Sequence, residues 1–160
     1  MKVSIESKVK FLATNPDLCL GCRSCELACG AGKAAKYTPE ERNSKRPIVP
    51  SIIVTQAQGL NKKIPAYCRH CENSFCLQLC PAKAITREHG AVKINDDKCT
   101  GCGICEQGCP YGVITMTSYK VNERTKTLAN KCDLCLDRQI NDRTPLCYTA
   151  CPTKAITLHS

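Results

Sequence analysis

Sixteen cysteines form four groups of four in this 160-residue sequence, and no cysteine is left over. In chain order the groups are Cys19, Cys22, Cys25 and Cys29; Cys68, Cys71, Cys76 and Cys80; Cys99, Cys102, Cys105 and Cys109; and Cys132, Cys135, Cys147 and Cys151. Closely spaced thiolates bind structural zinc or iron–sulfur clusters, whereas disulfides between such near neighbours would be strained. The cysteines therefore predict metal centres rather than cross-links.

The spacing within the groups distinguishes between zinc and iron–sulfur centres. Groups one and three read C-x2-C-x2-C-x3-C, the run in which ferredoxins hold [4Fe-4S] clusters. In that run three cysteines bind one cluster, and the fourth is a ligand of the other cluster of a pair. Groups two and four have longer middle intervals, which add little to the cost of loop closure. Group four alone would also suit zinc, but groups one and three carry a third cysteine that a zinc ribbon does not need.

Proline and glycine occupy regular places beside the cysteines. Pro81, Pro110 and Pro152 follow the last cysteine of groups two, three and four, where the missing N–H bends the chain away. Gly21 and Gly101 precede the second cysteine of groups one and three, where glycine permits left-handed backbone close to the sulfurs. We therefore expect these groups to lie in tight loops.

The composition agrees with an interior that is filled by metal clusters. Two Phe, five Tyr and no Trp are few large side chains for a domain of this length. The formal net charge is +9, but four oxidised clusters with four thiolates each would add about −8. The remaining charge of about +1 gives no indication of a nucleic-acid partner, although a zinc-loaded nucleic-acid module stays open as an alternative.

The sequence lacks the features of membrane, exported and nucleotide-binding proteins. No stretch approaches the ~18 apolar residues of a membrane helix, and no signal peptide or twin-arginine pair is recognisable. We therefore predict a cytoplasmic protein without a direct membrane span. No G-x-G-x-x-G fingerprint, phosphate-binding loop or activated nucleophile is recognisable either, so the sequence predicts no catalytic residues.

The segments around the cysteine groups repeat. Cys80-Pro-Ala-Lys-Ala-Ile-Thr after group two returns as Cys151-Pro-Thr-Lys-Ala-Ile-Thr after group four, and Cys109-Pro-Tyr-Gly-Val-Ile-Thr is a looser copy. Before group one, Asn15-Pro-Asp-Leu-Cys-Leu-Gly-Cys is similar to Asn95-Asp-Asp-Lys-Cys-Thr-Gly-Cys before group three. Such self-similarity indicates that one supersecondary unit is used several times.

Short strands are expected between the groups, because β-branched and apolar residues alternate there with turn signals. The expected strands are Pro47–Thr55, Ala84–Arg87, Ala91–Ile94, Val113–Thr117, Lys126–Ala129 and Ala155–Leu158. Glu88-His89-Gly90 predicts a hairpin turn, and residues 119–130 are expected to form a charged hairpin. The polar segment 30–46 is expected to be a surface loop with one helical turn near 39–42.

The cysteine motifs resemble those of a known family. They are Cys19-Leu-Gly-Cys-Arg-Ser-Cys-Glu, Cys68-Arg-His-Cys-Glu-Asn, Cys99-Thr-Gly-Cys-Gly-Ile-Cys, Lys131-Cys-Asp-Leu-Cys and Cys147-Tyr-Thr-Ala-Cys-Pro-Thr-Lys-Ala. In this order they resemble the four-cluster ferredoxin subunits of formate dehydrogenases, formate hydrogenlyase, the dimethyl sulfoxide reductase family and carbon monoxide dehydrogenase-linked hydrogenases. The resemblance covers about Phe11 to Leu158, and it departs from the family at Gly30, where a proline would be expected after Cys29.

The resemblance implies an α+β fold of two ferredoxin-like 2[4Fe-4S] halves within a single polyferredoxin domain over residues 1–160. Half one would comprise about 9–46 and 119–160, half two about 64–118, and 47–63 would be a connecting strand region. The resemblance also implies four [4Fe-4S] clusters with crossed ligation. The four ligand sets would be Cys19, Cys22, Cys25 and Cys151; Cys29, Cys132, Cys135 and Cys147; Cys68, Cys71, Cys76 and Cys109; and Cys80, Cys99, Cys102 and Cys105.

The same resemblance implies an electron-transfer subunit that performs no substrate chemistry. Its clusters would carry electrons between a large catalytic subunit and a second electron-transfer protein. The catalytic partner would be a molybdenum- or tungsten-pterin formate or aldehyde oxidoreductase, a hydrogenase or carbon monoxide dehydrogenase. A free soluble low-potential polyferredoxin shuttle is the alternative, and copies could also stack into a longer conductor.

Histidine and basic residues near the ligands are interpreted as neighbours of the clusters. Because sixteen cysteines suffice for four clusters, we expect His70 to pack or hydrogen-bond beside a cluster, and His89 and His159 to face solvent. Positive charge near a cluster favours its reduced state and raises its potential. The basic residues beside or near ligands are Arg23, Arg69, Lys83, Lys131, Arg138 and Lys154. For each of them an ordinary solvated surface position is the alternative.

Overall fold

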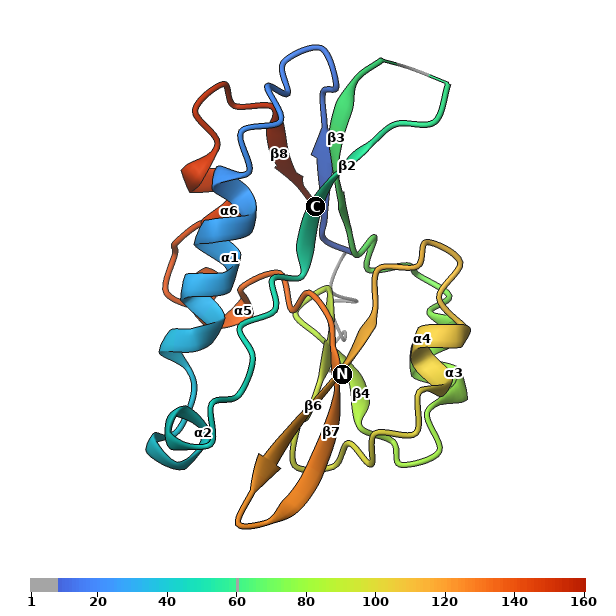
Figure 1. Cartoon of the computed structure of the whole chain (residues 1–160). Helices are drawn as coiled ribbons and strands as arrows, with labels where there is room; N and C mark the ends of the chain where they lie inside the picture. Colours follow the sequence, from blue (N-terminus) through green and yellow to red (C-terminus); the bar gives the residue numbers. More distant parts are fainter. Residues whose placement is uncertain (1–8, 60) are drawn as a thin grey trace.

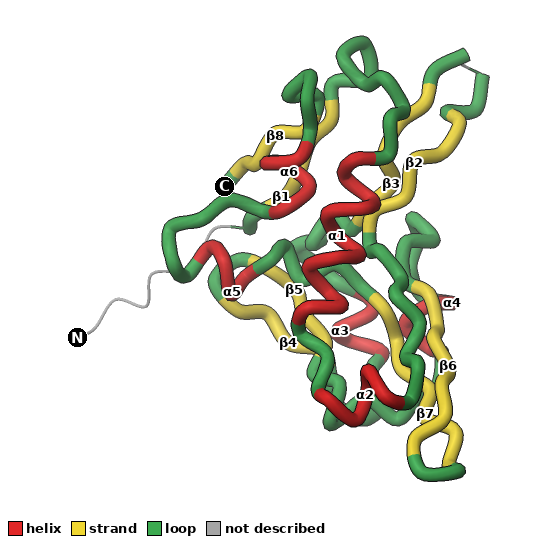
Figure 2. The backbone as a smooth tube through the Cα atoms, turned by 60° about the vertical axis from the view of Figure 1, so that its left-hand side comes forward, coloured by secondary structure: helices red, strands yellow, loops and turns green. Residues whose placement is uncertain are grey.

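The described residues, 9–59 and 61–160 of the computed structural model, form four two-stranded antiparallel sheets and six helices (Figure 1). The strands are β1 (Phe11–Thr14), β2 (Ile52–Gln56), β3 (Lys63–Tyr67), β4 (Ile85–Glu88), β5 (Ala91–Ile94), β6 (Thr115–Val121), β7 (Arg124–Asn130) and β8 (Ile156–His159). The helices are α1 (Ser24–Ala35), α2 (Pro39–Asn43), α3 (Phe75–Leu79), α4 (Ile104–Gln107), α5 (Leu136–Gln139) and α6 (Leu146–Ala150). Loops join these elements over much of the chain (Figure 2). The fold is α+β, as the sequence predicts.

Three of the sheets join neighbours in the sequence, and the fourth joins distant segments. β2 pairs with β3, β4 with β5 and β6 with β7, each as an antiparallel hairpin. β1 pairs with β8, with Thr14 opposite Ile156 (Figure 2). This pairing brings the segment before the first cysteine group against the segment that follows the fourth.

The repeated sequence segments also repeat in structure. The backbone N–H of Asn15 donates to the carbonyl of Ala155 at 2.8 Å, and the N–H of Asn95 donates to the carbonyl of Ala84 at 2.8 Å. Each asparagine directly follows a strand, β1 or β5, and each alanine directly precedes the antiparallel partner of that strand, β8 or β4. The loop before group one therefore lies against the segment after group four, and the loop before group three lies against the segment after group two.

Two cores of buried side chains form the interior, and both contain cysteines. The first comprises Leu12, Cys25, Ile52, Val54, Tyr67, Ala91, Leu134, Leu136, Cys147, Cys151, Ala155 and Ile156. The second comprises Ile85, Val92, Cys105, Ile114 and Ala129. Apart from Tyr67 their apolar side chains are small or aliphatic, so the cysteines are part of the packing rather than an addition to it.

Helix α1 shows that the expectation of a surface loop over 30–46 was wrong for the first part of that segment. The helix continues to Ala35, and the short α2 that follows confirms the helical turn expected near 39–42. Glycine allows α1 to pack closely against α6, because a Cβ on Gly32 would lie 2.1 Å from Leu146 Cδ1 of α6. Glycine lowers intrinsic helix propensity, so the helix owes its length to this contact with a distant part of the chain.

Most of the expected strands are confirmed, with shifts at their ends. β4 and β5 form the hairpin expected around Glu88-His89-Gly90, and β6 and β7 form the one expected over 119–130. β2 begins only at Ile52, and β6 begins at Thr115 and continues to Val121. β1 and β3 were not expected as strands. The partner of β1, β8, is remote in the sequence, and β3 is an additional strand directly before group two. Across residues 9–59 and 61–160, none of the helices has the length and apolar character needed to span a membrane.

The loops of groups one and three have the left-handed backbone expected of them. Gly21 has φ +67° and Gly101 has φ +71°. At Gly101 a Cβ would also lie 2.4 Å from the backbone oxygen of Thr127 in β7. The tight loop of group three thus lies directly against the β6–β7 hairpin.

We expect Gly101→Ala to lower the free energy of unfolding by about 3 kcal/mol, because a backbone clash adds to the cost of left-handed alanine. Gly103→Ala is the matched control: Gly103 has φ +77° but no atom within 4 Å of a Cβ, so only the backbone cost of about 1 kcal/mol remains. Thermal unfolding of both purified variants measures the difference. Equal melting temperatures for the two would contradict the importance of the Thr127 contact.

Candidate metal-cluster sites

Four cavities are each lined by four cysteines, three from one sequence group and one from another. Site 1 is lined by Cys19, Cys22, Cys25 and Cys151; site 2 by Cys29, Cys132, Cys135 and Cys147; site 3 by Cys68, Cys71, Cys76 and Cys109; and site 4 by Cys80, Cys99, Cys102 and Cys105. Every cysteine of the sequence lines one of these sites. The combinations are those that the family resemblance implies as ligand sets.

Helices place cysteines four residues apart between two sites. Cys25 and Cys29 lie on α1, and Cys147 and Cys151 lie on and directly after α6, which packs against α1. In both pairs one cysteine lines site 1 and the other lines site 2. Helices α3 and α4 form an equivalent packed pair between sites 3 and 4. Residues at i and i+4 share one face of a helix, so each helix pair serves two adjacent sites.

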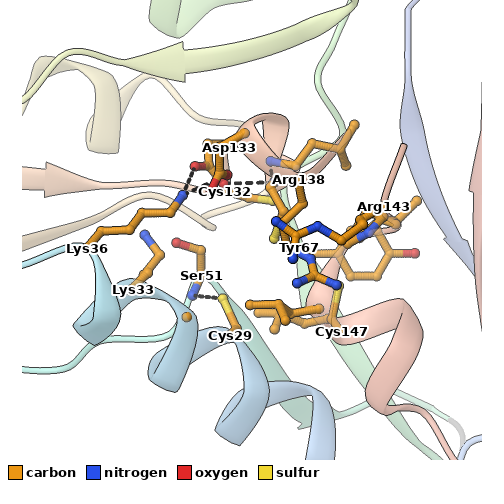
Figure 3. A pocket seen from close by; sticks show the side chains of 18 of the residues that line it. Cys29, Lys33, Lys36, Ser51, Tyr67, Cys132, Asp133, Arg138, Arg143 and Cys147 are labelled. Atoms are coloured by element: carbon orange, nitrogen blue, oxygen red, sulfur yellow. Dashed lines mark hydrogen bonds and ion pairs between the residues drawn. The ribbon is translucent and has the colours of Figure 1, made fainter. Parts of the chain in front are cut away.

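Site 2 is the most open of the four cavities, at about 330 Å³, whereas the other three measure about 20 to 30 Å³. In Figure 3, Cys29 and Cys147 lie on two sides of site 2, and Arg138 and Arg143 also line this cavity. Even the smaller cavities exceed the space that one water molecule needs. The cysteines of each site thus surround open volume.

Backbone N–H groups donate to the sulfurs in all four sites. They approach the sulfurs of Cys29, Cys68, Cys80, Cys132 and Cys151 at 3.2 to 3.3 Å. The repeated Cys-Pro-x-Lys-Ala segments use the same geometry twice, because Ala84 donates to Cys80 and Ala155 donates to Cys151. N–H donors stabilise the negative charge of thiolate sulfur, so these loops suit metal-bound cysteines.

The donor set and the cavities fit a [4Fe-4S] cluster. Within the described ranges, no three His, Cys, Asp or Glu side chains converge closely enough to hold one metal ion. Each site instead offers four thiol sulfurs around a space, and a cubane takes one thiolate on each of its four irons. The fit therefore rests on the number of sulfurs, their arrangement around a cavity and their N–H donors.

Burial makes several of these thiols poor acids. It raises the pKa of Cys147 to about 12, and smaller contributions come from Cys135, Cys29 and Cys25. It also raises the pKa of Cys105 to about 11 and that of Cys132 well above its ordinary value. Metal binding to such sites must release protons, because the ligand is the thiolate.

Shared structural elements show which sites are neighbours. Sites 1 and 2 share the packed helices α1 and α6. Lys131 lines site 3, and the next residue, Cys132, lines site 2. Sites 3 and 4 share the packed helices α3 and α4. The sites therefore follow one another in the order 1, 2, 3, 4.

The outer sites have the most accessible cysteines. Cys22 of site 1 and Cys102 of site 4 are exposed, whereas every other cysteine is buried or half-buried. Beside Cys22, the side chain of Leu20 is 71% exposed, and near Cys102 that of Ile104 is 39% exposed. Sulfur and apolar side chains thus reach the surface together at both ends of the series.

The histidines take the positions expected from the sequence. His70 is fully buried, and its Nδ1 accepts the Val92 N–H at 3.0 Å. Burial, reinforced by the Lys131 ammonium, lowers the pKa of His70 to about 3. His89 and His159 are exposed.

The six basic residues differ in their surroundings. Arg23, Arg69, Lys83 and Lys154 are exposed, Arg138 is half-buried in the lining of site 2, and Lys131 is buried with 5% of its surface exposed. For the four exposed residues, the solvated surface position is therefore the better description.

The Lys36 ion pairs at site 2 were not found by sequence reasoning. The Lys36 ammonium lies 3.0 Å from Asp133 Oδ2 beside the cavity (Figure 3). It also lies 3.0 Å from Asp137 Oδ1. Burial alone would raise the pKa of Asp133, but Lys36 outweighs it and the pKa is lowered. Asp133 adjoins a cysteine in the sequence, which could have drawn attention to it, whereas no sequence signal singles out Lys36.

Comparison with protein families finds two matches. The model of a 4Fe-4S dicluster domain matches residues 61–160, and that of a 4Fe-4S binding domain matches residues 16–32. The first match alone covers more than half of the chain.

Relatives that match nearly the whole chain include the following three. An iron-sulfur protein of Rhodospirillum rubrum is 38% identical over 155 residues, which cover 92% of this chain and 80% of the relative. The electron transport protein HydN of Escherichia coli is 36% identical over 161 residues, which cover 92% of this chain and 86% of HydN. UacF of Escherichia coli is 35% identical over 149 residues, which cover 93% of this chain but only 21% of UacF.

Proposed function

Because the chain belongs to the 4Fe-4S dicluster family of ferredoxin-type electron-transfer proteins, we propose that it passes electrons through four [4Fe-4S] clusters between a catalytic redox subunit and a second redox protein. The observation that carries this proposal is the presence of four cavities with four cysteines each. The clusters would supply reversible one-electron transfer. The chain would not carry out substrate chemistry itself.

We assign one cluster to each site, with the four cysteines of that site as its ligands. The crossed ligation would tie sites 1 and 2 together through α1 and α6, and sites 3 and 4 through α3 and α4. The repeated Asn15–Ala155 and Asn95–Ala84 hydrogen bonds support two equivalent halves. The residues of this chain would hold the clusters and donate N–H groups to their sulfur ligands.

The series of sites has two ends, which supports two partners. Electrons would enter and leave near Cys22 and Cys102, where sulfur and exposed apolar side chains lie together at the surface. The matched region makes up a fifth of the longer UacF chain, so a unit of this kind also occurs joined to a much larger polypeptide. The resemblance to subunits of formate-converting enzymes favours a molybdenum- or tungsten-pterin enzyme, a hydrogenase or carbon monoxide dehydrogenase as the catalytic partner. We place this complex in the cytoplasm.

Anaerobic purification of the tagged chain from its native host at high salt tests the proposal. We expect about sixteen irons per chain, no stoichiometric zinc, and co-purification of a large redox enzyme. A fully loaded monomer without a partner would instead identify a free ferredoxin shuttle. A colourless zinc protein would contradict the cluster assignment altogether.

A further inference from the structure

Sites 2 and 3, the two inner sites, occupy equivalent places in the internal repeat. Site 3 begins with Cys68 directly after β3, and site 2 includes Cys132 shortly after β7. Two residues after each of these cysteines, His70 and Leu134 donate their backbone N–H to its sulfur at 3.3 Å, and both have positive φ. The equivalence allows the two linings to be compared position by position.

At two equivalent positions the linings differ in polarity. Tyr67 directly precedes Cys68 of site 3, but its side chain lines site 2 together with Leu134. Lys131 directly precedes Cys132 of site 2, but its side chain lines site 3 together with His70. An aromatic and an aliphatic side chain at site 2 are thus replaced by an ammonium group and an imidazole at site 3.

Lys131 is a buried cation without an acidic partner. Its side chain is held by hydrogen bonds from Nζ to the carbonyls of Val92 and Cys132, the latter at 2.8 Å. Among the ion pairs of residues 9–59 and 61–160, none includes Lys131. Burying an unpaired charge is costly, so a compensating negative charge is expected beside it. An iron–sulfur cluster with four thiolates carries such a charge.

His70 offers a hydrogen-bond donor at the same site. Its Nδ1 accepts the Val92 N–H, so the neutral ring carries its proton on Nε2. That Nε2 is buried and has no hydrogen-bond partner in the described part of the chain. A buried donor left without an acceptor is costly, and a cluster sulfur would satisfy it. Val92 of β5 therefore fixes both polar groups of site 3, one through its N–H and the other through its carbonyl.

We propose that Lys131, assisted by His70, raises the reduction potential of the cluster at site 3. The inference rests on the proposed function, because it requires a cluster at this site. A fixed positive charge and an N–H donor stabilise the added electron of the reduced cluster. Arg69 also lines site 3, but it is exposed, so water and salt screen its charge.

Redox titrations followed by electron paramagnetic resonance (EPR) on anaerobically purified protein test this assignment. In Lys131→Met we expect one cluster to lose about tenfold in its affinity for an electron, which is about 59 mV in midpoint potential for a one-electron couple. Lys131→Arg keeps the charge and should retain the wild-type potential. Lys120→Met removes the same charge from an exposed position on the β6–β7 hairpin and should shift none of the clusters.

Two further variants identify the affected cluster. The EPR component whose midpoint potential falls in Lys131→Met should be the one whose signal changes in Cys71→Ser, because Cys71 lines site 3. His70→Leu copies the residue that the repeat places at site 2, and it should lower the potential of that same component.

The outcomes separate this inference from the proposed function. Four clusters with unchanged potentials in Lys131→Met, or an equal shift in Lys120→Met, would overturn the role of Lys131 while leaving electron transfer intact. Fewer than four clusters in the wild type would overturn the proposed function instead. Should Lys131→Met fail to load with iron, Lys131→Gln replaces it. If both neutral variants fail to bind iron but Lys131→Arg binds it, the positive charge at this position is what balances the cluster. If all three variants fail to bind iron, this role of the Lys131 charge is contradicted.

Discussion

Replacing Cys151 with alanine is expected to abolish the cluster of site 1 and to leave the other three in place. Iron should fall from about sixteen to about twelve atoms per chain, because each [4Fe-4S] cluster contains four. Cys151 lines the same cavity as Cys19, Cys22 and Cys25, although its nearest cysteine in the sequence, Cys147, lines site 2. The variant therefore tests the crossed ligation itself.

Cys147→Ala is the matched control. It also removes one thiol from the α6 segment, but that thiol lines site 2. The EPR component lost in Cys151→Ala should coincide with the one lost in Cys22→Ala. It should differ from the one lost in Cys147→Ala. If Cys151→Ala and Cys147→Ala abolish the same component, the ligands are not crossed, and the assignment of sites 1 and 2 is wrong.

Removal of the clusters by an iron chelator under anaerobic conditions should abolish most of the tertiary structure. Both cores are completed by cysteines, and their remaining side chains are small or aliphatic except for Tyr67. Without metal, the four sites would become cavities lined by thiols, and the segments that they join would be held by short sheets such as β1–β8 and by short helix contacts such as α1–α6. Site formation and folding are therefore expected to be coupled.

Near-ultraviolet circular dichroism and scanning calorimetry measure this loss. We expect the metal-free chain to lose its near-ultraviolet signal and its cooperative melting transition, and to regain both when iron and sulfide are supplied together. Zinc alone serves as the control and should not restore them. A metal-free chain with an unchanged spectrum and melting temperature would show that the clusters are dispensable for the fold.

The sequence predicts features that depend on neighbouring residues. The hairpin at Glu88-His89-Gly90 follows from a local turn signal, and the positive φ of Gly101 follows from its place beside a cysteine. The cysteine groups and their repeats can be read directly, because their spacing follows from the geometry of a cluster.

Features that depend on distant contacts could not be predicted. Helix α1 extends past Gly32 because Leu146 of α6 packs against it, and β1 forms because β8 lies beside it. The burial of Lys131 requires the carbonyl of Val92, which belongs to another hairpin. Neighbouring residues therefore indicated that Lys131 lies near a ligand, but only tertiary structure distinguishes it from the exposed Arg23.

The pairing of β1 with β8 has a consequence for biogenesis. A ribosome makes Cys19, Cys22 and Cys25 early, but β8 and Cys151 emerge only after every other described helix and strand. All cysteines of sites 3 and 4 lie between Cys68 and Cys109, so that portion can mature first on the nascent chain. A cluster at site 1 would therefore be completed only after Cys151 has been made, later than the clusters of sites 3 and 4.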